Sequence, residues 1–210
     1  MKAIIFDLDG VLVYTDRFHY QAWKRLADRL GIYFDETINN RLRGVSRMES
    51  LNIVLERADR PFSPEEKEHL AAEKNETYRT LLATMTPADV PPEVRETLTE
   101  LKRRGYRLAI GSSSKNTKYI LQQVNLTEFF DAVSDGTNIS HSKPDPEVFL
   151  KAAEFLDEAP EQCAVIEDAF SGIDAAKAAG MWAVGIGDAA TYERADARIQ
   201  MFSELLDLFP

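Results

Sequence analysis

The chain has 210 residues, enough for one substantial hydrophobic core and a smaller second domain or large insertion. Its 35 acidic residues outnumber its 25 lysines and arginines, and the resulting net charge of -10 argues against a nucleic-acid partner. The single cysteine, Cys163, leaves no disulfide framework. No apolar segment approaches the ~20 residues of a membrane span and no signal peptide precedes the first strand, so we expect a cytoplasmic protein.

The first predicted strand is the uncharged segment from Ala3 to Phe6, which ends abruptly at an acid. Because side chains alternate along a strand, Asp7 and Asp9 are expected to leave its carboxyl end on the same side, and Gly10 lets the backbone turn beside them. In open α/β sheets, ligands bind beyond the carboxyl ends of the strands. The alternative is a pair of solvated loop acids, and only the rest of the chain can distinguish the two interpretations.

Residues 15–86 show only helical patterns. Apolar residues at helical spacing predict a helix over about residues 16–30. Ser46 and Ser63 each precede a glutamate by three residues, which is the capping-box pattern and predicts two further helices. About 70 residues without a strand signal exceed an ordinary loop between a strand and a helix. We therefore expect residues 15–86 to form a helical cap domain inserted after the first strand.

Strands alternate with helices in the remainder of the chain, after a proline-rich return between Pro87 and Pro92 that is expected to exclude helix until Pro92. Predicted strands cover residues 107–110, 132–133, 164–166 and 182–186, and predicted helices lie near residues 94–101, 120–124, 148–156 and 173–179. This alternation predicts a parallel sheet with helices on both faces. Residues 1–14 and 87–210 are thus expected to form a doubly wound, Rossmann-like α/β core.

Polar residues follow four predicted strands where each strand ends. They are Asp7 and Asp9 after the first, Ser112, Ser113 and Ser114 after the second, Lys143 after the third, and Glu167 and Asp168 after the fourth. Each group alone is an ordinary loop feature, but their shared position suggests one site. Clustered carboxylates repel by about 4 kcal/mol per close pair at an effective dielectric near ~20, so a cation is expected among them. With oxygen ligands only, that ion is Mg2+, and Lys143 adds a second positive charge.

This combination is typical of phosphoryl transfer. Asp7 can act as the nucleophile and form an aspartyl phosphate, which splits one difficult displacement into two easier ones. Asp9 can protonate the leaving oxygen and later deprotonate the attacking hydroxyl, a role worth roughly 10² to 10⁴ in rate. A phospho-accepting receiver module and an inactive sugar-phosphate binder remain alternatives from other functional classes.

The same motifs resemble those of a known superfamily. Asp7-Leu8-Asp9-Gly10, a serine after the second strand, Lys143-Pro144 and Glu167-Asp168 are similar, in order, to the four motifs of the haloacid dehalogenase (HAD) superfamily of Mg2+-dependent phosphotransferases. The segments 19–23, 44–47, 74–75 and 112–116 resemble, within it, the β-phosphoglucomutase family. The resemblance implies a HAD-type fold with a cap, and interconversion of β-glucose 1-phosphate and glucose 6-phosphate through a bisphosphate and an aspartyl-phosphate enzyme.

The resemblance also implies roles for single residues. Asp7 is expected to carry the phosphoryl group and Asp9 to act as acid and base. Mg2+ is expected to bind Asp7, the carbonyl of Asp9, Glu167 and Asp168. The expected substrate- and phosphate-binding residues are Thr15, His19, Gly44, Val45, Ser46, Arg47, Lys74, Ser112, Ser113, Ser114, Asn116 and Lys143. Among them, Arg47 is expected to hold the distal phosphate, and His19 with Lys74 to couple closure of the cap to catalysis.

Several features of the chain leave alternatives open. Tyr14 stands where many relatives have aspartate, Arg43 replaces a lysine, and the chain after Gly187 matches weakly. Arg47 at a helix start suits a phosphate, but a solvated arginine beside a plain capping box has the same pattern. The main alternative is a sugar-phosphate phosphatase of the same superfamily, in which water resolves the aspartyl phosphate. We expect a monomer that acts on a small sugar phosphate, without nucleic acid or membrane.

Overall fold

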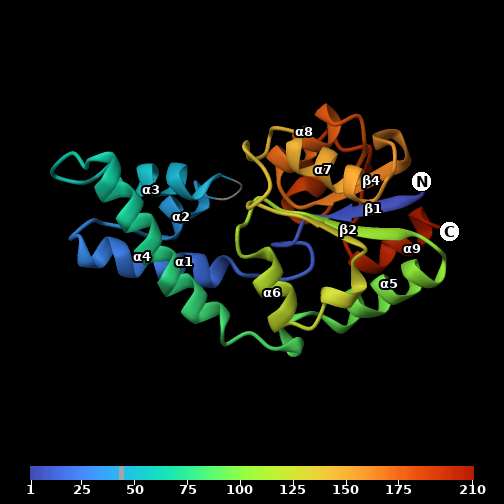
Figure 1. Ribbon diagram of the computed structural model, residues 1–210, viewed down its shortest axis with the longest axis horizontal. Helices are drawn as coiled ribbons and strands as arrows, with labels where there is room; N and C mark the ends of the chain where they lie inside the picture. The colour runs from blue at the N-terminus through green and yellow to red at the C-terminus, as the bar shows by residue number, and fades with distance from the viewer. Residues whose placement is uncertain (43–44) are drawn as a thin grey trace. The chain divides into compact units, whose positions relative to one another are not determined.

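The computed structural model describes residues 1–42 and 45–210 (Figure 1). The chain divides into two compact units, one formed by Met1–Tyr14 with Met85–Pro210 and the other by Thr15–Thr84. The boundaries expected from the sequence fell after residues 14 and 86, and the observed division falls after Tyr14 and Thr84. None of the helices in the described ranges is long and apolar enough to cross a membrane.

The larger unit is built on a six-stranded parallel sheet with the order β3-β2-β1-β4-β5-β6. Its strands are β1 (Ala3–Phe6), β2 (Arg107–Gly111), β3 (Ala132–Ser134), β4 (Cys163–Glu167), β5 (Trp182–Gly185) and β6 (Ala197–Arg198). Phe6 at the end of β1 is in register with Ile110 of β2 and Ile166 of β4. The chain runs outward from β1 in both directions, so the carboxyl end of β1 is the switch point where such folds bind ligands. The predicted doubly wound α/β fold is confirmed.

Helices cover both faces of this sheet. They are α5 (Pro92–Arg103), α6 (Thr117–Gln123), α7 (Glu147–Phe155), α8 (Phe170–Ala178) and α9 (Leu205–Leu208). Helices α7 and α8 lie on one face, and α5, α6 and α9 lie on the other (Figure 1). Ile5 packs with Phe149 of α7 on the first face, whereas the ring of Phe6 contacts Phe130 and Phe202 on the second.

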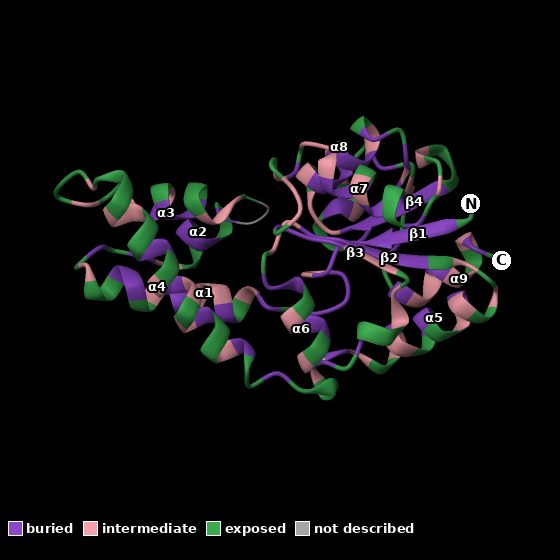
Figure 2. Cartoon of the chain, viewed as in Figure 1, coloured by how far each residue is buried: buried purple, intermediate pink, exposed green. Residues whose placement is uncertain are grey.

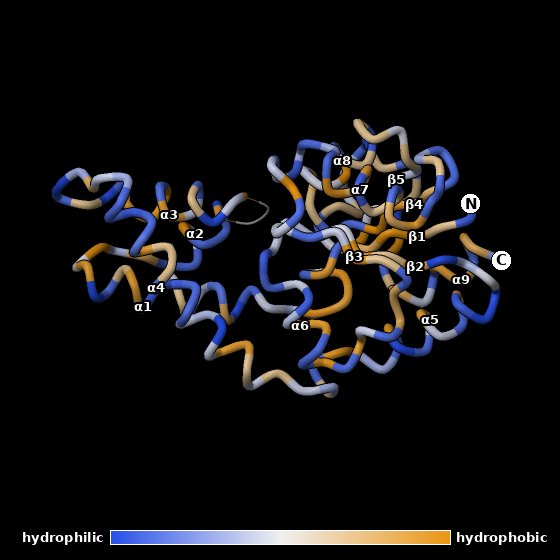
Figure 3. Tube along the Cα trace, viewed as in Figure 1, coloured by the Kyte–Doolittle hydropathy of each residue, from blue (hydrophilic) through white to orange (hydrophobic). Residues whose placement is uncertain are grey.

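Burial on both faces explains the uniformly apolar sequence of the central strands. All four residues of β1 are buried, and so are all five of β4 (Figure 2). A strand with one face in water would alternate apolar and polar residues, but a parallel strand covered by helices on both sides does not. The apolar stretch of β1 is visible in Figure 3. The chain becomes polar only where β1 ends.

Some local structure was not predicted. Strand β6, helix α9 and the 3-10 helices were missed; the latter are η1 (Pro87–Asp89), η2 (Thr127–Phe129), η3 (Pro160–Gln162), η4 (Gly187–Thr191) and η5 (Phe202–Glu204). The expectation of no helix before Pro92 was wrong, because Pro87 starts the η1 turn. Proline is tolerated at a first helical position, and the Thr86 hydroxyl accepts a hydrogen bond from the Ala88 amide at 3.3 Å.

The smaller unit is entirely helical in its described residues. It contains α1 (Asp16–Arg29), α2 (Glu36–Asn40), α3 (Arg47–Leu55) and α4 (Pro64–Leu82). Ser46 and Ser63 form the two predicted capping boxes at the starts of α3 and α4. A second hydrophobic cluster, which includes Trp23, Leu51 and Leu70, joins α1, α3 and α4. This unit therefore has its own core and its own helix-start signals.

Gly185 at the end of β5 has no room for a side chain. A Cβ there would lie 2.3 Å from the carbonyl oxygen of Ala189, whose amide donates to the carbonyl of Asp168 at 2.9 Å. We expect Gly185→Ala to displace this backbone and to lower the free energy of unfolding by about 3 kcal/mol, measured by urea denaturation. Gly105→Ala is the control, because a Cβ at Gly105 meets nothing within 4 Å and only its positive φ costs about 1 kcal/mol. Equal losses in the two variants would contradict this prediction.

Candidate active site

The carboxyl end of β1 leads directly into a tight turn that carries Asp7, Asp9 and Gly10. The amide of Asp7 donates to the carbonyl of Ile166 at 3.0 Å and continues the pairing with β4. Gly10 has a φ of 87°, which favours glycine, and a Cβ on it would lie 2.0 Å from Oδ2 of Asp168. The turn can therefore approach the Asp168 carboxylate only because residue 10 has no side chain.

Lys143 joins two of the expected acids. Its Nζ lies 2.5 Å from Oδ1 of Asp7 and 2.5 Å from Oε1 of Glu167, and all three side chains are buried. The ammonium also lies 4.7 Å from the centre of the Phe149 ring. Burial alone would lower the pKa of the Lys143 amine, but the carboxylates of Asp7 and Glu167 outweigh it and raise that pKa above its ordinary value. Lys143 is thus a buried cation and not a solvated loop lysine.

The acids around Lys143 leave an excess of negative charge. Burial raises the pKa of Asp168 to about 8, and the charges of Glu167, Asp7 and Asp9 act in the same direction. Burial also raises the pKa of Glu167, against the opposing effect of Lys143. One ammonium does not balance four carboxyl groups, so the site favours a further cation. The donors are oxygens, and the Gly10 turn leaves the Asp168 carboxylate uncovered by a side chain, which fits Mg2+.

A different trio of side chains also brings potential metal ligands together. These are His141, Asp145 and Glu147, whose ligand atoms lie within 4.8 Å of one another. Oε2 of Glu147 accepts the amides of Ser140 and His141 at 2.8 Å each, and Oδ1 of Asp145 accepts the Glu147 amide at 2.9 Å. Through these hydrogen bonds, the two carboxylates stabilise the loop before α7.

The serine loop after β2 is held mainly by its own polar groups. The Ser112 hydroxyl accepts the Ser114 amide at 3.3 Å, and the Ser114 hydroxyl accepts the Asn116 amide at 3.1 Å. A Cβ on Gly136 would lie 2.4 Å from the carbonyl oxygen of Ser113, so the turn after β3 packs closely on this loop. Ser112 and Asn116 are buried. The backbone of this loop is therefore held in place by its own side chains and by the turn after β3.

The expected residues of the smaller unit also gather, from three helices. Nζ of Lys74 on α4 lies 2.9 Å from Nδ1 of His19 on α1, and the Thr15 hydroxyl is hydrogen-bonded to the Tyr78 hydroxyl at 2.9 Å. Burial and, to a smaller extent, the charge of Arg47 at the start of α3 together lower the pKa of Lys74 to about 7. Burial, Lys74 and Arg47 together lower the pKa of His19 well below its ordinary value. Three basic groups thus face one another.

Gly44, Val45 and Ser46 were also expected at the site. Gly44 lies outside the described residues, and so does Arg43. Val45 is exposed, and the Ser46 hydroxyl accepts the Glu49 amide at 3.3 Å in the capping box of α3. Tyr14, the departure noted in the sequence, is exposed at the end of the first segment of the larger unit.

Aromatic rings that were not predicted from the sequence contact the two buried lysines. The rings of Trp23 and Tyr78 each lie 4.6 Å from Nζ of Lys74, and Phe149 lies against Lys143. Tyr78 follows Lys74 by four residues on one helix, so the spacing was an available signal. Phe149 gave no such signal, because its contact with Lys143 depends on where α7 packs.

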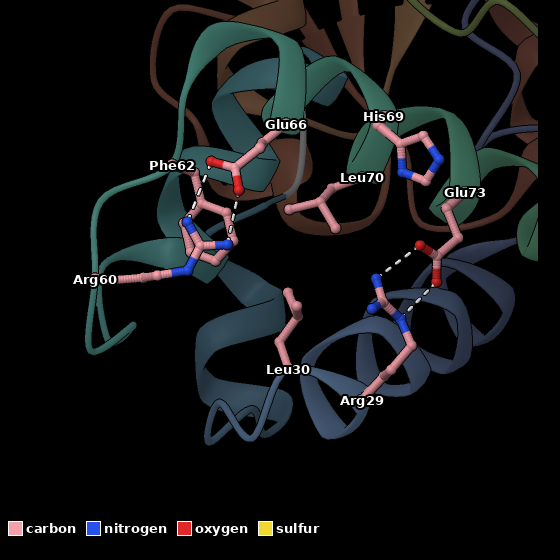
Figure 4. Close-up of a pocket in the computed structure, with 8 residues that line it drawn as sticks. All are labelled: Arg29, Leu30, Arg60, Phe62, Glu66, His69, Leu70 and Glu73. Atoms are coloured by element: carbon pink, nitrogen blue, oxygen red, sulfur yellow. Dashed lines mark hydrogen bonds and ion pairs between the residues drawn. The ribbon is translucent and has the colours of Figure 1, made fainter.

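A hollow of about 240 Å³ in the smaller unit involves none of the expected site residues (Figure 4). Two ion pairs, Arg29 with Glu73 and Arg60 with Glu66, lie on either side of Leu30 and Leu70 in this view. Each arginine is bonded through two nitrogens to its glutamate. Because these charges already satisfy each other, the hollow offers no cation for a phosphate.

Comparisons with known proteins identify the family. The sequence pattern of the haloacid dehalogenase-like hydrolases matches residues 1–180. The chain is 42% identical over 207 residues to the β-phosphoglucomutase of Bacillus subtilis (strain 168), covering 98% of this chain and 92% of that protein. It is 32% identical to the fructose-1-phosphate phosphatase of Escherichia coli (strain K12), covering 88% of this chain and 95% of that protein.

Comparison with solved structures identifies the same family. The crystal structure of β-phosphoglucomutase from Clostridium difficile matches with a TM-score of 0.91 at 38% sequence identity, covering 98% of this chain and 93% of that one. The resemblance deduced from the strand-end motifs is therefore confirmed. The chain is an enzyme of the haloacid dehalogenase superfamily and belongs to its β-phosphoglucomutase family.

Proposed function

We propose that this enzyme interconverts β-glucose 1-phosphate and glucose 6-phosphate through a sugar bisphosphate and a phosphoaspartate on Asp7, with Mg2+ as cofactor. The observation that carries the proposal is the buried contact of Lys143 with Asp7 and Glu167 at the carboxyl end of β1. The 42% identity to the Bacillus subtilis β-phosphoglucomutase supports the choice of reaction.

Asp7 is the nucleophile in this proposal. Its carboxylate attacks the phosphorus atom, an acyl phosphate forms, and the bond from phosphorus to the sugar oxygen breaks. Lys143 fixes the orientation of the carboxylate and offsets the negative charge that gathers on the phosphoryl oxygens. The fixed hydroxyls and amides of the Ser112–Asn116 loop bind the same phosphoryl group.

Asp9 moves the protons of both half-reactions. It gives a proton to the departing sugar oxygen, and it later removes a proton from the hydroxyl that attacks the phosphoaspartate. Asp7, the Asp9 carbonyl, Glu167 and Asp168 hold the metal ion. When bound, Mg2+ supplies the positive charge that offsets the phosphoryl oxygens and the excess of acids.

The basic residues of the smaller unit bind the rest of the substrate in this proposal. Arg47 binds the phosphate that is not being transferred, supported by its place at the start of α3, where helix amides and a guanidinium fork suit a phosphate. His19 and Lys74 lie beside it and respond to its charge. Thr15, Val45, Ser46 and Gly44 complete the proposed binding set.

A sugar-phosphate phosphatase is the second candidate, favoured by the 32% identity to the Escherichia coli fructose-1-phosphate phosphatase. Both reactions use the same phosphoaspartate, and they differ in whether water or a sugar hydroxyl attacks it. The test incubates the enzyme with β-glucose 1-phosphate, Mg2+ and a trace of glucose bisphosphate. We expect glucose 6-phosphate to accumulate with little free phosphate; free phosphate without glucose 6-phosphate would establish the phosphatase instead.

Asp7→Asn replaces the nucleophile with a neutral amide of the same shape. We expect turnover to fall by roughly 10⁴-fold or more and phosphorylation of the protein to be lost, measured with labelled substrate in a single turnover. Asp157→Asn is the matched control, since Asp157 is exposed and its φ of 53° suits asparagine. Turnover that survives in Asp7→Asn would show that another group is the nucleophile.

Asp168 makes stability and metal binding depend on pH. Its pKa is raised from an ordinary 3.8 to about 8, so without metal its contribution to the free energy of unfolding falls as pH rises from about 4 to about 8. Thermal unfolding in a chelator should show a smaller loss between pH 6 and pH 8 for Asp168→Asn than for the wild type. Since Mg2+ needs the ionised carboxylate, it should raise the wild-type Tm more at pH 8 than at pH 6.

The variant supplies the control for this metal effect. Mg2+ should raise the Tm of Asp168→Asn little at either pH, because a neutral amide does not replace the carboxylate. Equal Mg2+ stabilisation of wild type and variant would remove Asp168 from the metal site.

A further inference from the structure

Lys74 is enclosed by aromatic rings inside the smaller unit. Its side chain is nearly inaccessible, with 3% of the residue exposed. The rings of Trp23 on α1 and Tyr78 on α4 each lie 4.6 Å from Nζ. Nδ1 of His19 lies 2.9 Å from the same nitrogen. The neighbours of this amine thus include the two rings and the His19 imidazole.

Tyr78 contacts His19, Lys74 and Thr15. Its ring lies against that of His19, with centroids 4.1 Å apart and an angle of 30° between the planes. Its hydroxyl is bonded to that of Thr15, the first residue of the smaller unit. Burial lowers the pKa of Arg47, and the Tyr78 phenol acts in the opposite direction. Tyr78 is itself 1% exposed.

We propose that Tyr78 is a positioning residue for the reaction, which sets the mutual geometry of His19 and Lys74 and ties them to Thr15 at the start of the unit. The proposal rests on the proposed function, in which these basic residues bind the sugar phosphate. Tyr78 itself contacts no reacting atom in this scheme. It acts through the side chains that it holds.

The ring and the hydroxyl of Tyr78 make separable contributions. The ring lies under Lys74 and beside His19, and its face attracts the lysine cation. The hydroxyl makes the bond to Thr15. Tyr78→Phe removes only the hydroxyl, whereas Tyr78→Leu removes both. Because a displacement of about 1 Å in binding groups can cost about 10²-fold in rate, the ring is expected to matter more.

Steady-state kinetics of glucose 6-phosphate formation form the first test. We expect kcat/KM to fall about fivefold in Tyr78→Phe, as for one hydrogen bond, and about a hundredfold in Tyr78→Leu. Thr15→Val should cost less in the Tyr78→Phe background than in the wild type, because both changes remove the same bond. Tyr20→Phe is the matched control, since Tyr20 stacks on Phe34 in the same unit.

Two further measurements separate positioning from a general loss of structure. Phosphorylation of Asp7 by acetyl phosphate reports on the larger unit alone and should be unchanged in Tyr78→Leu. The 15N resonance of His19 Nδ1 reports on the contact with Lys74, and it should shift in Tyr78→Leu but not in Tyr20→Phe. Slower Asp7 phosphorylation in Tyr78→Leu, or mutase activity within twofold of wild type, would overturn the proposal.

Different results would contradict the proposed mutase reaction and the proposed positioning role of Tyr78. A wild-type enzyme that phosphorylates Asp7 but forms no glucose 6-phosphate would refute the mutase reaction. In that case an unchanged His19 resonance in Tyr78→Leu would also overturn the positioning role, and a shifted resonance would support it.

Discussion

The buried contact of Lys143 with Asp7 and Glu167 is the interaction on which the site of the larger unit depends. It joins the ends of β1 and β4, two neighbouring strands whose acids would otherwise repel each other at close range. A buried charge without a partner costs several kcal/mol, so each of the three groups requires the others. One ammonium still leaves the acids in excess, and burial together with these neighbouring acids raises the pKa of Asp168.

The two units carry opposite imbalances of charge. Acids outnumber the cation at the end of β1, whereas Lys74 and His19 are buried beside Arg47 and have depressed pKa values. A divalent cation relieves the first imbalance and a phosphate relieves the second, because each supplies the missing sign of charge. On the proposed function, the depressed pKa of Lys74 belongs to an amine whose charged form a bound anion would stabilise.

Features that depend on near neighbours in the chain were predictable. The capping boxes at Ser46 and Ser63 involve residues three positions apart, and the apolar run of β1 follows from burial on both faces. The short elements near the C-terminus were not predictable, since the two residues of β6 are too few for a periodic pattern. The η1 turn was not predicted, because the prolines were expected to exclude helix. Pro87 instead follows the capping residue Thr86 and occupies the first position of the turn.

The sequence by itself determined the order of the first five strands with the helices between them, and the polar residues that follow four of those strands. Parallel α/β units place these strand ends along one edge of the sheet. The tertiary structure alone decided what each polar residue contacts. Lys143 could have been a solvated loop lysine, but it lies between Asp7 and Glu167. Lys74 could have been a surface residue, but Trp23 and Tyr78 enclose it. Tyr78 follows Lys74 by four residues on α4, but the other partners in these contacts lie on different elements. No local pattern encodes such pairs, so only the packing of the chain brings them together.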